Sequence, residues 1–323
     1  MTQDKLLSMS SGKTISELIP LALSLGPALE VSGYPKPGNV HRLRDQPDKR
    51  FEDFLASSHA MLIAMIKAFD DGLHLRGGMG RHVFSAIKLA NTLTDGRNTC
   101  LGTATLLIPI AYTAGVLSKE GDLPECDDLV TETTRVLMDH STVDDAIWFY
   151  RAVREANPRY VRDTRSPIEG LLPDIWSPSF AEELRTGNIR LWDVLKKSSL
   201  WDLVSRECVS GYPESLWVSR TLSKLREKGW DWNVAVVYTY LGLLAKREDS
   251  LVFRKNGAEA ARLIRDMASK ALADDWEKGV PASVWSMDRY LQEKGWNPGA
   301  TADIIATGIS LYYYEKVVKS GSS

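Results

Sequence analysis

Residues 30–42 carry the densest set of groups that could bind a ligand, and they read Glu-Val-Ser-Gly-Tyr-Pro-Lys-Pro-Gly-Asn-Val-His-Arg. Two prolines fix backbone φ angles in this segment, and Gly38 permits close approach of another group to the backbone. An acid, an amide and several cations on a stiff loop suit a phosphate-rich ligand or a metal complex. We therefore predict a binding loop rather than part of a buried core. Its candidate ligand-binding side chains are Glu30, Lys36, Asn39, His41 and Arg42.

Small polar residues also recur at helical spacing between apolar positions. Asp303, Thr307 and Ser310 share one stripe near the end of the chain, and Asp53 and Ser57 stand one turn apart. A carboxylate between apolar helix faces is costly unless it is paired, hydrogen-bonded or bound to a metal. Packed together, such stripes would line a polar cavity inside a helical bundle. A third stripe opens another apolar segment with Asn98, Thr99 and Gly102.

Each carboxylate has a simpler interpretation that stays open. Asp303 follows a Pro-Gly step and could lie in a first helical turn, where it would complement the helix dipole. Asp144 lies three residues after Ser141, which is the spacing of a capping box. Asp53 could lie on a solvated helix face.

The elements that must position these groups are helical. Apolar residues recur three and four positions apart over long stretches, and no alternating runs separated by hairpin signals occur. We predict an all-α fold in which residues 1–323 form one domain, a multi-helix bundle with a polar, carboxylate-lined central cavity. Residues 157–180, which contain several prolines, are expected to form a long loop. The predicted helices cover residues 15–29, 51–69, 103–117, 141–155, 189–197, 201–208, 214–228, 234–245, 259–273, 284–293 and 300–318, and a further helix is expected to follow the glycine-rich residues 76–81.

Composition limits the possible functions. The net charge of −2 lacks the basic excess of a duplex-binding protein, so we expect no nucleic acid partner. Prolines and Glu17 argue against a signal peptide, and no long uninterrupted apolar span predicts a membrane helix. Three widely spaced cysteines indicate a reducing compartment, and we expect a cytoplasmic protein. Ten tryptophans are many, and exposed ones could form a homodimer face.

Six segments in order resemble the triphosphoribosyl-dephospho-CoA synthase family. The resemblance covers most of the chain. Its most specific parts are the Pro-Lys-Pro-Gly-Asn-Val run at 35–40 with Glu30 before it, and the Asn-Thr-x-x-Gly step at 98–102. The other four similar segments are residues 51–58, 141–158, 249–257 and 297–303.

The resemblance implies an all-helical transferase. It would transfer the 5-triphosphoribosyl group of ATP to the 2′-hydroxyl of 3′-dephospho-CoA and release adenine, with Mg²⁺ accompanying ATP. The chain departs from the bacterial pattern after the Pro-Lys-Pro-Gly loop, where residues 43–50 are charged, and at Cys100-Leu101, where bacterial members have His-Lys. It is more similar to archaeal members, so the resemblance indicates the fold and the nucleotide site more firmly than the acceptor.

Transfer at a ribose C1′ needs a carboxylate near developing positive charge, a base for the incoming hydroxyl, and cations for the phosphates. We hypothesise that the catalytic residues are Asp53, Asp144 and Asp303, and that the metal ligands are Glu30, Asp53, Asp249 and Asp303. The nucleotide- and phosphate-binding residues would be Lys36, Gly38, Asn39, His41, Arg42, Ser57, Asn98, Arg254 and Lys255.

Two other functions stay open at this point. One is a different Mg²⁺-dependent ribosyl transfer or N-glycosidic cleavage that uses the same nucleotide pocket with another acceptor, such as water. The other is a non-catalytic nucleotide-binding scaffold whose tryptophans form partner surfaces.

Overall fold

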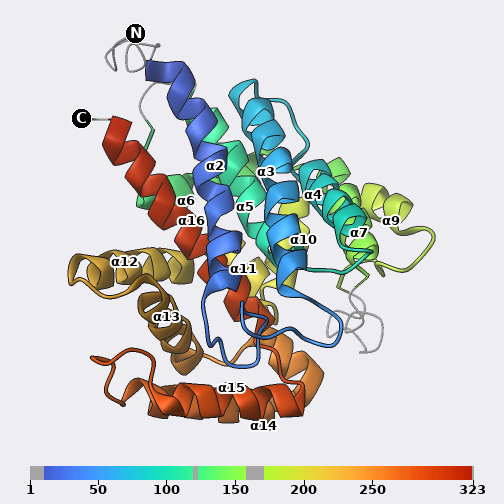
Figure 1. Cartoon of the computed structure of the whole chain (residues 1–323). Coiled ribbons are helices and arrows are strands. Elements are labelled where there is room, and N and C mark those ends of the chain that lie inside the picture. The colour runs from blue at the N-terminus through green and yellow to red at the C-terminus, as the bar shows by residue number, and fades with distance from the viewer. Residues whose placement is uncertain (1–10, 119–122, 158–170, 322–323) are drawn as a thin grey trace.

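The chain folds into helices, as predicted (Figure 1). The computed structural model describes residues 11–118, 123–157 and 171–321, and within these ranges it has fourteen helices and no strands. In chain order they are α2 (Ser11–Ser32), α3 (Phe51–Leu73), α4 (Met79–Leu93), α5 (Leu101–Ser118), α6 (Cys126–His140), α7 (Val143–Ala156), α9 (Phe180–Thr186), α10 (Leu191–Ser198), α11 (Leu203–Val209), α12 (Pro213–Glu227), α13 (Trp232–Lys246), α14 (Ser250–Leu272), α15 (Ala282–Lys294) and α16 (Gly299–Gly321).

Helix α5 lies at the centre of the bundle and packs against α2, α3, α4, α6 and α16. Its sequence is apolar on nearly every face because almost every face meets another helix. In the described part of the chain, Leu101–Ser118 is the one segment long and apolar enough to cross a membrane, and 72% of it is buried inside the structure. This degree of burial is typical of a helix in the core of the bundle.

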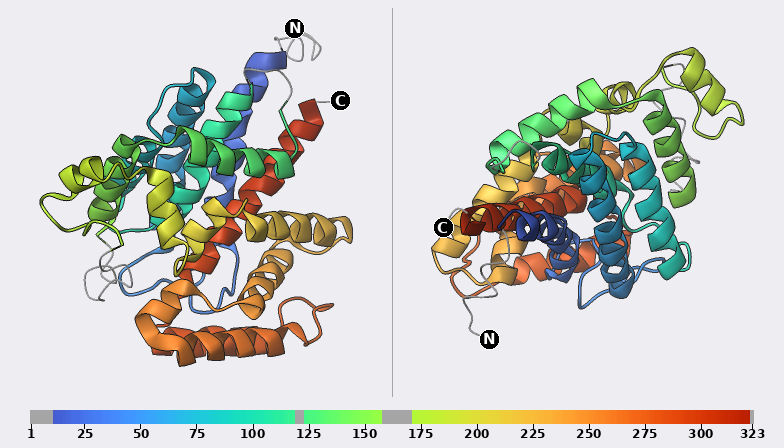
Figure 2. Two further views of the ribbon diagram at one scale, coloured as in Figure 1. Left: turned by 180° about the vertical axis from the view of Figure 1, so that it is seen from behind. Right: turned by 90° about the horizontal axis from the view of Figure 1, so that it is seen from above.

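The first and last described helices, α2 and α16, lie side by side with their outer ends at the same end of the molecule (Figure 2). A Cβ added at Gly26 would lie 2.1 Å from the carbonyl oxygen of Ala306, so the absent side chain permits this close crossing. The Ser310 hydroxyl donates to the carbonyl of Leu23 at 2.6 Å. Ser310 and Thr307 are fully buried here, so of the predicted polar stripe on α16 only Asp303 lines a cavity.

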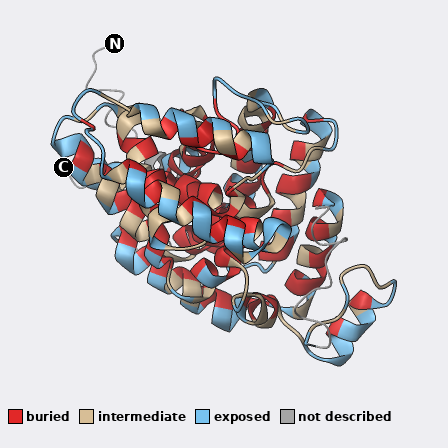
Figure 3. Ribbon diagram, turned by 90° about the horizontal axis from the view of Figure 1, so that it is seen from below, coloured by how far each residue is buried: buried red, intermediate tan, exposed pale blue. Residues whose placement is uncertain are grey.

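Helices α14 and α15 cross the opposite end of the bundle, next to the connection between α2 and α3 (Figure 1). Seen from that end, the outer helices expose residues on their outward faces and bury those that face the bundle (Figure 3). Asp249 is the N-cap of α14 and ties it to α16. One of its carboxylate oxygens accepts from the amides of Leu251 and Val252, and the other accepts from the amide and hydroxyl of Thr301 at 2.7 Å.

The sequence prediction missed or misplaced three elements. Helix α6 was not predicted, and α9 begins at Phe180, where a long loop was expected to end. Most of that expected loop, residues 158–170, lies outside the described residues. Helix α14 begins nine residues earlier than predicted, because its first turns continue across a break at Gly257, whose φ of 86° is not helical.

Candidate active site

A cavity of about 630 Å³ lies between α3, α5, α7, α11 and α16, a size typical of small-molecule sites. The sequence predicted a polar, carboxylate-lined cavity; carboxylates do line this one, but apolar side chains form much of its wall. Seven of the predicted site residues line it: Glu30, Asn39, Ser57, Asn98, Arg254, Lys255 and Asp303.

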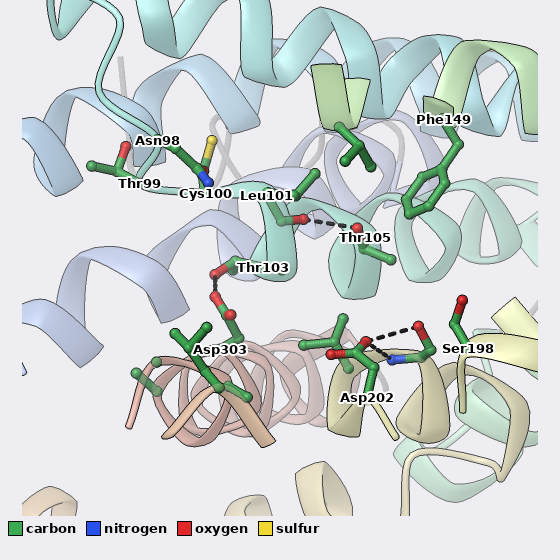
Figure 4. Close-up of a pocket in the computed structure, with 18 of the residues that line it drawn as sticks. Asn98, Thr99, Cys100, Leu101, Thr103, Thr105, Phe149, Ser198, Asp202 and Asp303 are labelled. Atoms are coloured by element: carbon green, nitrogen blue, oxygen red, sulfur yellow. Dashed lines mark hydrogen bonds between the residues drawn. The ribbon is translucent and has the colours of Figure 1, made fainter. Parts of the chain in front are cut away.

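Asp303 projects from α16 toward the start of α5 (Figure 4). The hydroxyl of Thr103 donates to its Oδ1 at 2.5 Å. Removal from bulk water raises the pKa of Asp303 to about 7, and the negative charge of Glu30 adds to that rise. Helix α16 begins at Gly299 and has no acid in its first turn, so the helix-dipole interpretation of Asp303 is wrong. A carboxyl group with this pKa can both take and return a proton near neutral pH.

The absence of a side chain at Gly102 leaves room for the other oxygen of the same carboxylate. A Cβ added at Gly102 would lie 2.0 Å from Oδ2 of Asp303, which is too close for any side chain. Gly102→Ala should therefore displace the Asp303 carboxylate and lower kcat by about 10²-fold, the size of effect that a ~1 Å misplacement produces. Steady-state rates together with a thermal melt would check this. A variant with normal kcat would show that the position of this carboxylate does not limit turnover.

Glu30 and Lys36 form a buried ion pair beneath the cavity. Lys36 is 0% exposed and donates to Oε1 of Glu30. Burial raises the pKa of Glu30 and lowers that of Lys36, while their mutual attraction opposes both shifts. Lys36 does not line the cavity, so the structure gives no support to the prediction that it binds phosphate. Lys36 instead holds Glu30, which does line the cavity.

Gly38, Asn39 and His41 of the predicted binding loop are also buried, contrary to expectation. The amide of Gly38 donates to Asp288 at 3.1 Å, and Nε2 of His41 lies 3.4 Å from the same carboxylate. Gly38 has a φ of 77°, and a Cβ there would lie 2.2 Å from the carbonyl oxygen of Trp296. The glycine thus permits the expected close approach, but to the protein's own backbone. Arg42 is exposed and donates to the carbonyl of Ser32, away from the cavity.

Three predicted carboxylates do not line the cavity. Asp53 accepts from the amide of Arg50 at the start of α3 and pairs with Arg97 at 3.2 Å. Asp144 is exposed on α7, whose capping box uses Thr142 and Asp145, one residue later than predicted. One oxygen of Asp249 caps α14, and the other accepts from the amide and hydroxyl of Thr301 on α16. Asp53 and Asp249 are held by these partners and Asp144 faces solvent, so none of the three lies in the cavity where its predicted catalytic or metal role would be exercised.

The described residues contain no group of three or more His, Cys, Asp or Glu side chains that could hold a metal ion. Of the predicted metal ligands, Glu30 and Asp303 line the cavity. Mg²⁺ bound to a nucleotide needs only one or two protein carboxylates, because phosphates and waters complete its shell. This pair therefore fits Mg²⁺ that enters with its nucleotide as substrate.

Sequence reasoning missed four charged residues that line the cavity: Lys49, Asp174, Glu183 and Asp202. Asp202 is the N-cap of α11, where its Oδ2 accepts from the amide and hydroxyl of Ser205 at 2.9 and 2.8 Å. Its Oδ1 accepts from Arg254 at 3.1 Å. The sequence prediction placed Asp202 inside the helix 201–208 rather than before it, so the cap was missed, and no local pattern signals its contact with Arg254.

Comparisons with known proteins fit this architecture. Residues 16–322 match the profile of the ATP:dephospho-CoA triphosphoribosyl transferase family, CitG. The chain belongs to this family. The family is one of transferases, which confirms the resemblance seen in the sequence.

A solved structure from Archaeoglobus fulgidus, described as a candidate triphosphoribosyl-dephospho-CoA synthase, has the same fold as this transferase-family chain. The two superpose with a TM-score of 0.60 at 24% identity, over 81% of this chain and 98% of that one. At this identity the likeness speaks for the fold alone. No curated protein sequence matches the chain.

Proposed function

We propose that this transferase moves the 5-triphosphoribosyl group of ATP to the 2′-hydroxyl of 3′-dephospho-CoA and releases adenine. The observation that carries the proposal is Asp303: a carboxyl group with a pKa of about 7 lines the cavity of a chain that belongs to this family. The carboxylate would be poised near neutral pH to accept the proton of an attacking hydroxyl.

The reaction forms one bond and breaks one. The acceptor's 2′-oxygen bonds to C1′ of the ATP ribose, and the bond between C1′ and N9 breaks, so that adenine leaves with the electron pair. In this proposal Asp303 takes the hydroxyl proton, and the departing adenine gains one, so protons balance overall. Glu30 and ionised Asp303 also place negative charge near the oxocarbenium-like ribose, which lowers its energy.

Cations and amides that line the cavity near Asp303 would bind the nucleotide. Lys49, Arg254 and Lys255 would contact phosphates, with Arg254 oriented by Asp202. Asn98 and Asn39 carry amides suited to the polar edges of a purine or a ribose. Glu30 would ligate the Mg²⁺ that accompanies the triphosphate, and Asp303, as the base, would stay outside the coordination shell of the metal.

The proposal is tested by incubating the purified protein with ATP and Mg²⁺ and measuring free adenine with and without dephospho-CoA. Adenine that appears only with dephospho-CoA, together with a product carrying the added mass of triphosphoribose, supports the transfer. Adenine release that ignores dephospho-CoA would favour cleavage or another acceptor. Nucleotide binding without adenine release would favour a scaffold.

The pKa of Asp303 sets an expected pH dependence. The base must be ionised, so kcat/KM for the acceptor should fall tenfold for each pH unit below about 7 and level off above it. Measurements from pH 5 to 9, with the stability of the protein verified at each pH, would check the profile. A rate that is flat between pH 5 and 8 would show that Asp303 is not the base.

We also propose that the enzyme acts in the cytoplasm, where ATP is available, and that it is a homodimer. Trp285 is 39% exposed on α15, which supports a partner surface without identifying it. Size-exclusion chromatography with light scattering would give the oligomeric state directly.

A further inference from the structure

The cavity has a second end whose chemistry differs from that around Asp303. Apolar side chains from α7, α10 and the segment before α9 line it, and Phe149 lies across the cavity from Asn98 (Figure 4). These residues belong to a small hydrophobic cluster separate from the main core. The lining residues used below are Phe149, Tyr150, Leu172, Ile175 and Val194.

The wall made by residues 171–177 is held in place by side chains from the neighbouring helices. The Tyr150 hydroxyl donates to the carbonyl of Pro173 at 3.1 Å. Arg154 donates to the carbonyls of Ile175 and Ser177 at 2.5 and 2.7 Å. Because the backbone is fixed in this way, Leu172 and Ile175 form a prepared apolar surface, which lowers the entropic cost of binding a flexible ligand.

Charge at this end is unsuitable for phosphate. The charged side chains that the elements at this end add to the lining are the carboxylates Asp174 and Glu183, whereas the lining cations are Lys49, just before α3, and Arg254 and Lys255 on α14. Carboxylates repel phosphate but accept hydrogen bonds from amides and hydroxyls. The apolar end therefore suits an uncharged, largely aliphatic group that carries hydrogen-bond donors.

Only one part of the two substrates of the proposed reaction has that character. Adenine, ribose and the phosphates are polar or charged, and Asn98 and the cations offer partners for them. The remaining part is the pantetheine arm of dephospho-CoA, which has a gem-dimethyl group, a hydroxyl and two amides. We propose that the cavity end formed by Leu172, Ile175, Phe149 and Val194 binds this arm and so selects dephospho-CoA over acceptors that lack it. This inference rests on the proposed function.

The test compares binding of dephospho-CoA with binding of ADP, which is the same molecule without the arm, by isothermal titration calorimetry. The wild type should bind dephospho-CoA at least tenfold more tightly than ADP. In Leu172→Ala/Ile175→Ala that advantage should fall about tenfold or more, because burying apolar surface is the source of the preference. Affinity for ADP and the KM for ATP should not change. Leu171→Ala is the matched control, since Leu171 is 48% exposed and does not line the cavity.

Three results would overturn the inference: equal affinities of the wild type for dephospho-CoA and ADP, an unchanged preference in the double variant, or a raised KM for ATP in that variant. The last would place adenine at the apolar end. Because calorimetry needs no turnover, failure of the transfer reaction is distinguishable. If the transfer reaction fails but the inference holds, no adenine will be released. The wild type will still prefer dephospho-CoA to ADP, and the double variant will have lost that preference.

Discussion

Asp303→Asn should lower kcat by about 10²- to 10⁴-fold, the contribution that a positioned general base makes to proton transfer. The amide has nearly the shape of the carboxyl group, and its oxygen can still accept from Thr103. It cannot accept the proton of an attacking hydroxyl. Binding of ATP should change far less than kcat, since the residues proposed to contact its phosphates lie on α14 and at Lys49. Adenine release under saturating substrate is the measurement.

The matched control is Asp144→Asn, which removes the same charge from an exposed position on α7. This variant should turn over at the wild-type rate. Its free energy of unfolding should lie within about 0.5 kcal/mol of the wild-type value, as is usual for surface substitutions. If Asp303→Asn kept activity within a few-fold of wild type, the base would have to be sought elsewhere, with Glu30 and Asp202 as the remaining carboxylates near the lining cations.

Lys36→Met should cost about 3–5 kcal/mol of unfolding free energy, because it leaves the Glu30 carboxylate buried without its partner. The loss should depend on pH. Burial raises the pKa of Glu30 in the folded state, so the folded variant binds a proton more readily than the unfolded chain. Its stability should therefore fall as the pH rises above about 4.5, and the deficit relative to wild type should be smallest in acid. Urea titrations at several pH values measure this.

The double variant Glu30→Gln/Lys36→Met distinguishes the cost of an unpaired buried charge from the cost of changed side-chain packing. It removes both charges, so it should recover much of the lost stability while remaining inactive, if Glu30 stabilises the ribose as proposed. Equal stability of Lys36→Met and the wild type at pH 8 would contradict the buried pair seen in the structure.

The helices were largely predictable because their periodicity depends only on local sequence. Even α13, with several β-branched residues, is helical as predicted, since its length and the absence of partner strands outweighed propensity. Helix α6 was predictable in principle. Its buried residues Leu129, Val130, Thr133, Val136 and Leu137 follow helical spacing after Asp127 and Asp128 in the first turn.

The site was less predictable because a carboxylate near a helix start looks the same in sequence whether it caps the helix or faces a ligand. Asp53 and Asp249 cap helices, whereas Asp202 caps one and also lines the cavity. The Pro-Lys-Pro-Gly loop posed the reverse problem. Its charges suggested a surface, yet Lys36 and His41 find buried carboxylate partners in Glu30 and Asp288. Asp288 is more than 240 positions away in the chain, so only the tertiary fold reveals that partner.

The pairing of α2 with α16 has a consequence for synthesis of the protein. Glu30 comes from the first described helix and Asp303 from the last, and the two helices pack along one another. On the ribosome, α2 must therefore wait with an uncovered apolar flank until α16 has been translated. A nascent chain arrested before α16 emerges would expose that flank to chaperones and would lack half of its acidic pair, so catalytic competence should arise only after α16 has emerged.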